Sequence, residues 1–167
     1  RAYFDEQLPH RIERARRLQS VLAIAYVDLN GFKEINDTSG HPVGDEVLRV
    51  ISSRLRSEFM PHFIARVGGD EFALLIETDR ARAIGLQQMV ETRINNIFKS
   101  ISLNGRTLRP GAAVGVTILN DGDDSYSLVK RADDYMYAAK STRQRIAFVY
   151  DGNQKFEGNE EIVSGAA

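Results

Sequence analysis

The sequence contains no cysteine and no tryptophan among its 167 residues. The absence of cysteine excludes disulfide bonds, thiolate zinc sites, iron–sulfur clusters and a cysteine nucleophile. Neither sign of charge dominates, since 22 Lys and Arg face 23 Asp and Glu, for a formal net charge of −1. A general nucleic-acid binder usually carries a strong basic excess, so we expect no nucleic-acid partner. The chemistry of this chain must therefore use oxygen and nitrogen ligands.

The sequence also lacks a long hydrophobic run. The apolar stretch at residues 21–27 is far shorter than the roughly 20 residues of a membrane helix, and no signal-peptide pattern opens the chain. We expect a cytoplasmic domain without direct membrane contact, whether or not the parent protein is anchored to a membrane. A hydrophobic content of 43% indicates a folded domain with a substantial core.

Apolar residues at helical spacing alternate along the chain with short apolar runs. The helical spacing predicts a short helix after Gly31 and longer helices near residues 4–18, 43–55, 83–97 and 128–139. The runs predict strands at 21–27, 63–67, 72–76, 112–119 and 146–150, and a hairpin at 101–108. Because hairpins interrupt the alternation, we predict an α/β (α+β) fold with a mixed central sheet flanked by helices.

The ends of the chain differ from its middle. No helix cap precedes Arg1, so we expect the natural domain to begin upstream of it. The last residues are rich in Gly, Asn and Glu. We therefore expect residues 1–150 to form one domain and residues 151–167 a flexible C-terminal tail.

Glycines and carboxylates concentrate in two segments, one at the end of the first strand and one in a hairpin turn. They read Asp28-Leu29-Asn30-Gly31-Phe32-Lys33 and Gly68-Gly69-Asp70-Glu71. If the two strands are neighbours, Asp28, Asp70 and Glu71 meet at one edge of the sheet. Their mutual repulsion would be relieved by a hard cation such as Mg²⁺ holding a nucleotide polyphosphate. The glycines allow close backbone approach, and the N–H groups of Gly31 and Phe32 are available to an anion.

A simpler interpretation of these two segments also exists. Asp28 would then cap the helix that follows it, and Asp70 and Glu71 would lie on a solvated hairpin turn. Each residue taken singly fits this interpretation, whereas the spacing of the whole set favours a ligand site.

The same segments belong to a longer pattern. It consists of Asp28-Leu29-Asn30-Gly31-Phe32-Lys33-Glu34-Ile35-Asn36-Asp37, Gly40-His41, Gly44-Asp45 and Arg66-Val67-Gly68-Gly69-Asp70-Glu71-Phe72. Ala132-Asp133, Tyr137 and Ala139-Lys140 follow later in the chain. Over residues 3–150 the sequence resembles the diguanylate cyclase (GGDEF) family. The resemblance implies a palm-like fold similar to the catalytic domain of nucleotide cyclases and polymerases.

The resemblance also implies an activity, the condensation of two GTP molecules into cyclic di-GMP with release of two pyrophosphates, used in bacterial second-messenger signalling. It implies two Mg²⁺ ions per half-site, with Mn²⁺ as an acceptable substitute, and the ligands Asp28, the Leu29 carbonyl, Asp70 and Glu71. Asp70 would also help to deprotonate the attacking 3′-hydroxyl. Lys33 would act on the phosphates, as would Lys140 and Arg143.

By the same resemblance Asn36 and Asp45 read the guanine base, and His41 lies near the substrate. The chemistry is suitable, because a carboxylate accepts from guanine N1–H and the amino group, and an amide donates to O6. Without the surrounding motif, Asn36 would be a turn residue, Asp45 a helix cap and His41 a packed turn histidine.

One such domain holds one GTP, so the resemblance implies a homodimer of facing half-sites, controlled by an upstream sensory domain. A catalytically silent GTP-binding or dimerisation module that regulates a fused partner is the alternative, and a domain without any ligand is a third hypothesis.

The sequence departs from the family at several places. Ala113 stands where serine is frequent, and the family's usual opening motif is missing. The family's product-inhibition motif Arg-x-x-Asp is replaced by Phe59-Met60-Pro61-His62, so we expect no feedback inhibition through it. Asn30 stands where aspartate is common. Ser141-Thr142-Arg143 lacks the usual glycine, which bears on the phosphate role of Arg143.

Overall fold

The continuous apolar run after residue 20 forms β1 (Val21–Asn30), the middle strand of the sheet. In the computed structural model, which describes residues 1–151, β1 pairs antiparallel with β3 (Glu71–Thr78) on one side and β6 (Gly111–Ile118) on the other. All of its residues except the first and last are buried, which confirms a strand covered on both faces. The strand continues past Asp28 to Asn30, because both neighbours keep pairing with it there.

The sheet is mixed, as predicted. Its order is β2 (Phe63–Arg66), β3, β1, β6 and β7 (Ile146–Tyr150), and only β6 and β7 run parallel. The predicted hairpin at 101–108 forms a separate two-stranded sheet from β4 (Ile101–Leu103) and β5 (Arg106–Leu108).

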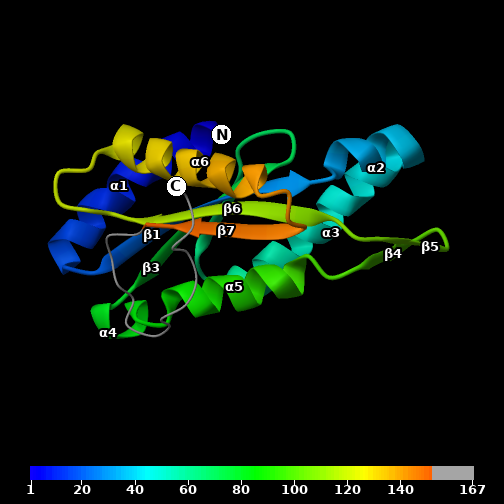
Figure 1. The fold of residues 1–167 in the computed structure, drawn as a ribbon. Coiled ribbons are helices and arrows are strands. Elements are labelled where there is room, and N and C mark those ends of the chain that lie inside the picture. The colour runs from blue at the N-terminus through cyan, green and yellow to red at the C-terminus, as the bar shows by residue number, and fades with distance from the viewer. Residues whose placement is uncertain (152–167) are drawn as a thin grey trace.

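Helices cover both faces of the sheet (Figure 1). One face carries α1 (Ala2–Leu18) and α6 (Ser125–Ser141), and the other carries α3 (His41–Phe59) and α5 (Leu86–Ile97). Each face has its own cluster of buried apolar side chains. The single helix predicted at 83–97 is instead two, α4 (Arg80–Ala83) and α5, with Gly85 between them. The short predicted helix after Gly31 is α2 (Phe32–Ser39).

Helix α6 lies unusually close to the sheet. A Cβ atom at Gly115 of β6 would be 2.1 Å from the carbonyl oxygen of Ala132 and 2.3 Å from the nitrogen of Met136. Only a residue without a side chain allows this approach, because real Cβ atoms keep more than 3 Å from such neighbours. The contact sets the distance from the sheet of every side chain on the inner face of α6.

An ion-pair network closes the connection from β6 to α6. The Arg131 guanidinium donates to both carboxylate oxygens of Asp123, at 2.9 and 2.6 Å, and to the Thr117 hydroxyl at 2.6 Å. The hydroxyl of Thr117 also donates to Asp151, which is buried. The packed part of the chain therefore includes Asp151, the first residue of the predicted tail, and the rest of that tail, residues 152–167, lies outside the described residues.

Asp123→Asn should lower the free energy of unfolding at pH 7 by about 1–2 kcal/mol. Hydrogen bonds from Arg131 lower the pKa of Asp123 from 3.8 to about 2, and a pKa lowered by folding stabilises the protein above the unfolded value. The deficit of the variant should therefore shrink as the pH falls below 4, as measured by urea unfolding over a pH series. Asp134→Asn is the control, since its partner Lys130 is exposed. A deficit independent of pH would contradict the assignment.

Candidate functional site

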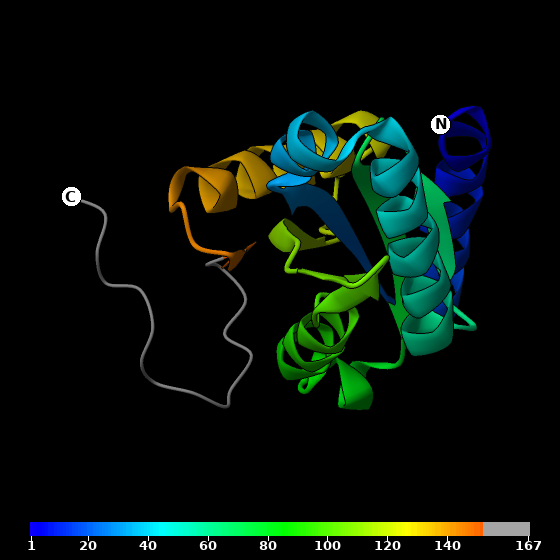
Figure 2. The ribbon, with the colours of Figure 1, turned by 90° about the vertical axis from the view of Figure 1, so that its right-hand side faces the viewer.

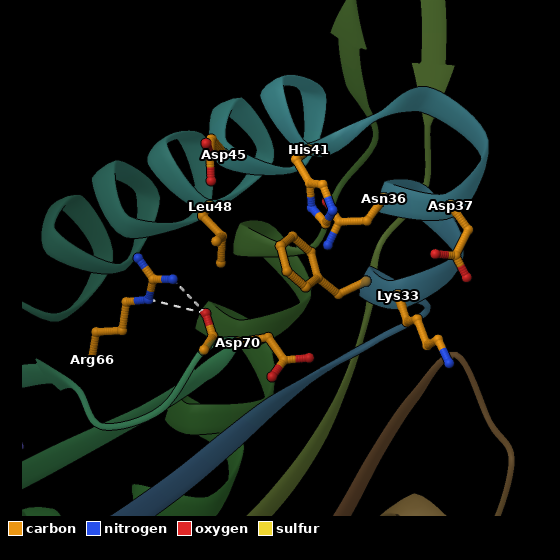
Figure 3. Close-up of a pocket in the computed structure, with 10 residues that line it drawn as sticks. Lys33, Asn36, Asp37, His41, Asp45, Leu48, Arg66 and Asp70 are labelled. Carbon is orange, nitrogen blue, oxygen red and sulfur yellow. Dashed lines mark hydrogen bonds between the residues drawn. The ribbon is translucent and has the colours of Figure 1, made fainter.

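A pocket opens where β1 ends and the chain enters α2. Gly31 makes this entry with a φ of +80°, and Gly40, with a φ of +86°, ends α2 and precedes α3. Figure 2, which views the molecule from this edge, shows α2 beside the start of α3. The pocket has a volume of about 400 Å³ and is lined by Phe32, Lys33, Asn36, Asp37, His41, Asp45, Leu48, Arg66, Gly69 and Asp70 (Figure 3). The structure thus brings together seven of the predicted site residues.

The pocket combines a few polar groups with an apolar floor, as small-molecule sites commonly do. Leu48 is buried and Phe32 is half-buried, whereas His41 and Asp45 are exposed. Asp45 lies inside α3, well past the N-cap residue Gly40, and makes no capping hydrogen bond. The cap interpretation of Asp45 and the packed-histidine interpretation of His41 are therefore wrong.

A second group of charges lies on the opposite face of the sheet, under α6. Asp28 is directly opposite Glu71 in the antiparallel register, and its side chain is almost fully buried. The Lys140 ammonium nitrogen lies 2.9 Å from Asp28 Oδ1. Asp28 does not cap α2, whose N-cap residue is Gly31. The interpretation of Asp28 as a helix cap is therefore wrong.

Burial and like charge perturb both carboxyl groups. Burial raises the pKa of Asp28, and the charge of Asp70 adds to this, while the hydrogen bond and charge of Lys140 act in the opposite direction. Burial also raises the pKa of Glu71, and so do the negative charges of Asp28 and Asp70. A positive charge close to Asp28 and Glu71 would offset their mutual repulsion, and the Lys140 ammonium group already supplies one.

The predicted meeting of three carboxylates occurs at one edge of the sheet but on two faces. Asp70 lines the pocket beside α2 and α3, whereas Asp28 contacts α6. Within residues 1–151 no three Asp, Glu or His side chains are close enough to hold a metal ion by themselves. Mg²⁺ usually takes one or two carboxylates together with phosphate oxygens. The mutually repelling pair of buried Asp28 and half-buried Glu71 fits an ion bound in that manner and does not fit an all-protein cage.

The two glycines of the hairpin turn have different neighbours. A Cβ atom at Gly68 would lie 2.3 Å from Glu71 Oε2, so the present position of the Glu71 carboxylate depends on glycine there. At Gly69 nothing lies within 4 Å of such an atom, and the position faces the pocket. The space beside Gly69 is therefore left free for a ligand.

Sequence reasoning did not assign Arg66 or Asn30 to the site. The Arg66 side chain donates two hydrogen bonds, of 3.0 and 2.5 Å, to the carbonyl oxygen of Gly69 (Figure 3). The Asn30 amide donates to the carbonyl oxygen of Gln144 at 3.3 Å, a bond that an ionised aspartate could not make. The position of Arg66 just before the glycine pair was the only available signal, and no local pattern reveals the partner of Asn30.

Arg143 is the predicted site residue that the structure connects least to the others. It is exposed, it is not among the pocket residues, and its backbone N–H bonds to the Lys140 carbonyl oxygen. Its φ of +59° is unusual for a residue with a side chain. Such a conformation is what the glycine common at this place in the family would adopt without strain.

Comparison with known proteins gives the family. Residues 1–145 match the family described as "Diguanylate cyclase, GGDEF domain". This chain belongs to the GGDEF family. Its predicted membership is thereby confirmed, and so is the α/β fold with a mixed five-stranded sheet between helices.

Individual relatives agree with the family match. The diguanylate cyclase TpbB of Pseudomonas aeruginosa is 34% identical over 84% of this chain and 33% of its own length. A solved structure of the GGDEF domain of TpbB has a TM-score of 0.79 at 31% identity, covering 89% of this chain and 88% of that one. The GGDEF domain of DgcB from Caulobacter crescentus, solved in complex with c-di-GMP, has a TM-score of 0.77 at 26% identity and covers 89% of both chains.

Relatives of this GGDEF domain do not all carry the name of a cyclase. The cyclic di-GMP phosphodiesterase NbdA of P. aeruginosa is 35% identical over 97% of this chain and 21% of its own length. The chain thus spans about a fifth to a third of the length of these two curated relatives. No helix within the described range 1–151 has the length and apolarity needed to cross a membrane.

Arg66→Ala should loosen the turn of this GGDEF domain while leaving its sheet intact. The loss of both donors to Gly69 should speed amide hydrogen exchange at residues 68–70 about 3- to 10-fold, the equivalent of one modest hydrogen bond. Exchange in β1 should not change. Arg17→Ala, on the exposed side of α1, is the matched control. Unaltered exchange in the turn would show that Arg66 does not hold it.

Proposed function

We propose that this GGDEF domain condenses two GTP molecules into cyclic di-GMP and releases two pyrophosphates. The observation that carries the proposal is the junction of two chemically different sites at the end of β1. Asp70 lines the pocket, and the adjacent residue Glu71 lies opposite Asp28 on the other face. The likeness to TpbB, a diguanylate cyclase, and to a DgcB domain that holds c-di-GMP supports the same substrate class.

The pocket between α2 and α3 would take the guanine base. Asp45 would accept hydrogen bonds from guanine N1–H and the amino group, and the Asn36 amide would donate to O6. Adenine has an acceptor at N1 and a donor in place of O6, so it would leave both side chains unpaired. His41, which lines the same pocket, would contact the substrate from the start of α3.

The triphosphate would lie across the sheet edge. The N–H groups of Gly31 and Phe32 would face it from the start of α2, and the backbones of Gly68 and Gly69 would approach it from the turn. Lys33 and Lys140 would supply positive charge, with Arg143 as a further cation at the end of α6. In this structure Lys140 offsets the charge of Asp28.

Asp28, Asp70, Glu71 and the Leu29 carbonyl would hold two Mg²⁺ or Mn²⁺ ions together with phosphate oxygens. When bound, such ions lower the pKa of the attacking 3′-hydroxyl and neutralise the leaving pyrophosphate. Asp70 would accept the proton of that hydroxyl, since it belongs both to the pocket and to the charged edge. Lys33 would stabilise the negative charge that develops on the phosphates.

Two domains must face each other, because one pocket holds one base and the product contains two. We therefore propose a homodimer with twofold symmetry as the active unit, brought together under control of a sensory domain upstream in the full protein.

A catalytically silent GTP-binding module that regulates a fused domain is the second candidate. The observation in its favour is the 35% identity to NbdA, a protein named for cyclic di-GMP hydrolysis. The intact Gly68-Gly69-Asp70-Glu71 turn and the pocket beside it favour the cyclase.

Incubation with GTP and Mg²⁺ should yield cyclic di-GMP and pyrophosphate, measured by chromatography and a coupled phosphate assay. The initial rate should rise with the square of protein concentration while the dimer is scarce. Asp70→Asn should reduce the rate at least 100-fold, because proton acceptance and charge are both lost. The control Asp134→Asn should retain activity. GTP binding without product at every concentration, even in an artificially fused dimer, would instead establish the silent module.

Asp45→Ala should weaken selection for guanine more than it weakens catalysis. The ratio of kcat/KM for GTP to that for ATP should fall by about 10-fold or more, because the hydrogen bonds that Asp45 would accept from guanine N1–H and the amino group are lost. Mg²⁺ dependence should stay as in the wild type. An unchanged ratio would remove Asp45 from base recognition.

A further inference from the structure

Gly44 is a buried glycine inside α3, immediately before Asp45. A glycine inside a helix costs about 1 kcal/mol relative to alanine. Gly44 does not have a positive φ, so the backbone does not require glycine at this position. The reason for its presence must be a neighbour that needs the space.

That neighbour is the side-chain amide of Asn36. A Cβ atom at position 44 would lie 1.9 Å from Asn36 Oδ1, 2.9 Å from its Cγ and 3.4 Å from its Nδ2. Even a methyl group is therefore incompatible with the present position of the amide. Within residues 1–151 the Asn36 amide makes no side-chain hydrogen bond. Packing against Gly44 is thus a principal restraint on the amide.

The backbone cannot separate to make room for a side chain. The Gly40 N–H donates to the Asn36 carbonyl oxygen at 2.9 Å, and the Gly44 N–H donates to the Gly40 carbonyl oxygen at 3.3 Å. These two bonds tie α2 to α3 on either side of Gly40. The Asn36 side chain, with its two rotatable bonds, is the part that yields most cheaply. A substitution at position 44 should therefore displace the amide and leave the fold in place.

We propose that Gly44 is a positioning residue for base recognition, which holds the Asn36 amide where it can donate to O6 of a guanine base. This inference rests on the proposed function of the pocket. Asn36 and Asp45 line the same pocket (Figure 3). Because Gly44 and Asp45 are adjacent in α3, one helical turn sets both the packing surface for the amide and the carboxylate that reads the opposite part of the guanine edge.

Gly44→Ala tests the inference through binding of GDP, IDP and ADP, which lack the pyrophosphate leaving group of the reaction. The affinities for GDP and IDP should fall by the same factor, about 3- to 10-fold for one lost hydrogen bond. The bases of GDP and IDP both have O6, the atom to which the Asn36 amide would donate. They differ in the amino group that Asp45 would read, which IDP lacks, so a loss at Asn36 alone affects both equally. ADP affinity should not fall. Calorimetric titration in Mg²⁺ buffer measures all three.

A double-mutant cycle separates positioning from general damage. In an Asn36→Ala background, Gly44→Ala should cause no further loss of GDP affinity, because its effect runs through the amide. Thermal unfolding of Gly44→Ala should occur at the same or a higher temperature than in the wild type, since alanine favours the helix. The side-chain amide signals of Asn36 in a ¹H–¹⁵N spectrum should shift without any nucleotide present. Gly85→Ala is the control, because the nearest atom to a Cβ there is 4.0 Å away.

The outcomes distinguish this inference from the proposed function. A wild-type preference for GDP over ADP that survives unchanged in Gly44→Ala would overturn the inference alone. Further loss of GDP affinity in the Asn36→Ala background would overturn it as well. Equal affinity of the wild-type protein for GDP and ADP would overturn the guanine specificity of the pocket and the inference together.

Discussion

The structure depends on the burial of a carboxylate near the end of the middle strand of the sheet. Asp28 is only 3% exposed between β3 and β6, and an ion in such a place is costly without a partner of opposite charge. Lys140 of α6 provides that partner. The contact requires α6 to lie close to the sheet, which the bare backbone of Gly115 permits, and the Arg131–Asp123 pair holds the loop that leads into the helix.

The two faces of the sheet divide the chemistry between them. The face covered by α1 and α6 carries Asp28, Glu71 and Lys140. Burial and mutual repulsion destabilise the two carboxylates there, so a nearby cation stabilises them. The pocket on the other face is lined by Asn36, Asp45 and Asp70, and its apolar floor and few polar groups suit an aromatic ring. A nucleotide spanning the edge would present its base to the pocket and its phosphates to the charged edge, with Asp70 between the two.

Much of this arrangement could be predicted from sequence. The apolar run at 21–27 and the glycine pair at 68–69 are local signals, and they predict the buried strand, the hairpin and the meeting of carboxylates at one edge. The contact of Lys140 with Asp28 joins residues 112 positions apart in the chain, and no local pattern contains it. The same holds for the Asn30 amide and for Asp151, whose burial depends on Thr117 and Tyr135. The break between α4 and α5 was missed because apolar periodicity continues across Gly85.

The boundary between the turn and β3 falls between two carboxylates. Asp70 ends the turn and lines the pocket, whereas Glu71 begins β3 and lies opposite Asp28 on the other face of the sheet. Because the pairing of β3 with β1 holds Glu71 opposite Asp28, insertion or deletion of a single residue in the turn would alter the position of Asp70 at the pocket, although every residue of the motif would still be present. The length of the turn between β2 and β3 therefore matters to the site as much as the identity of its residues.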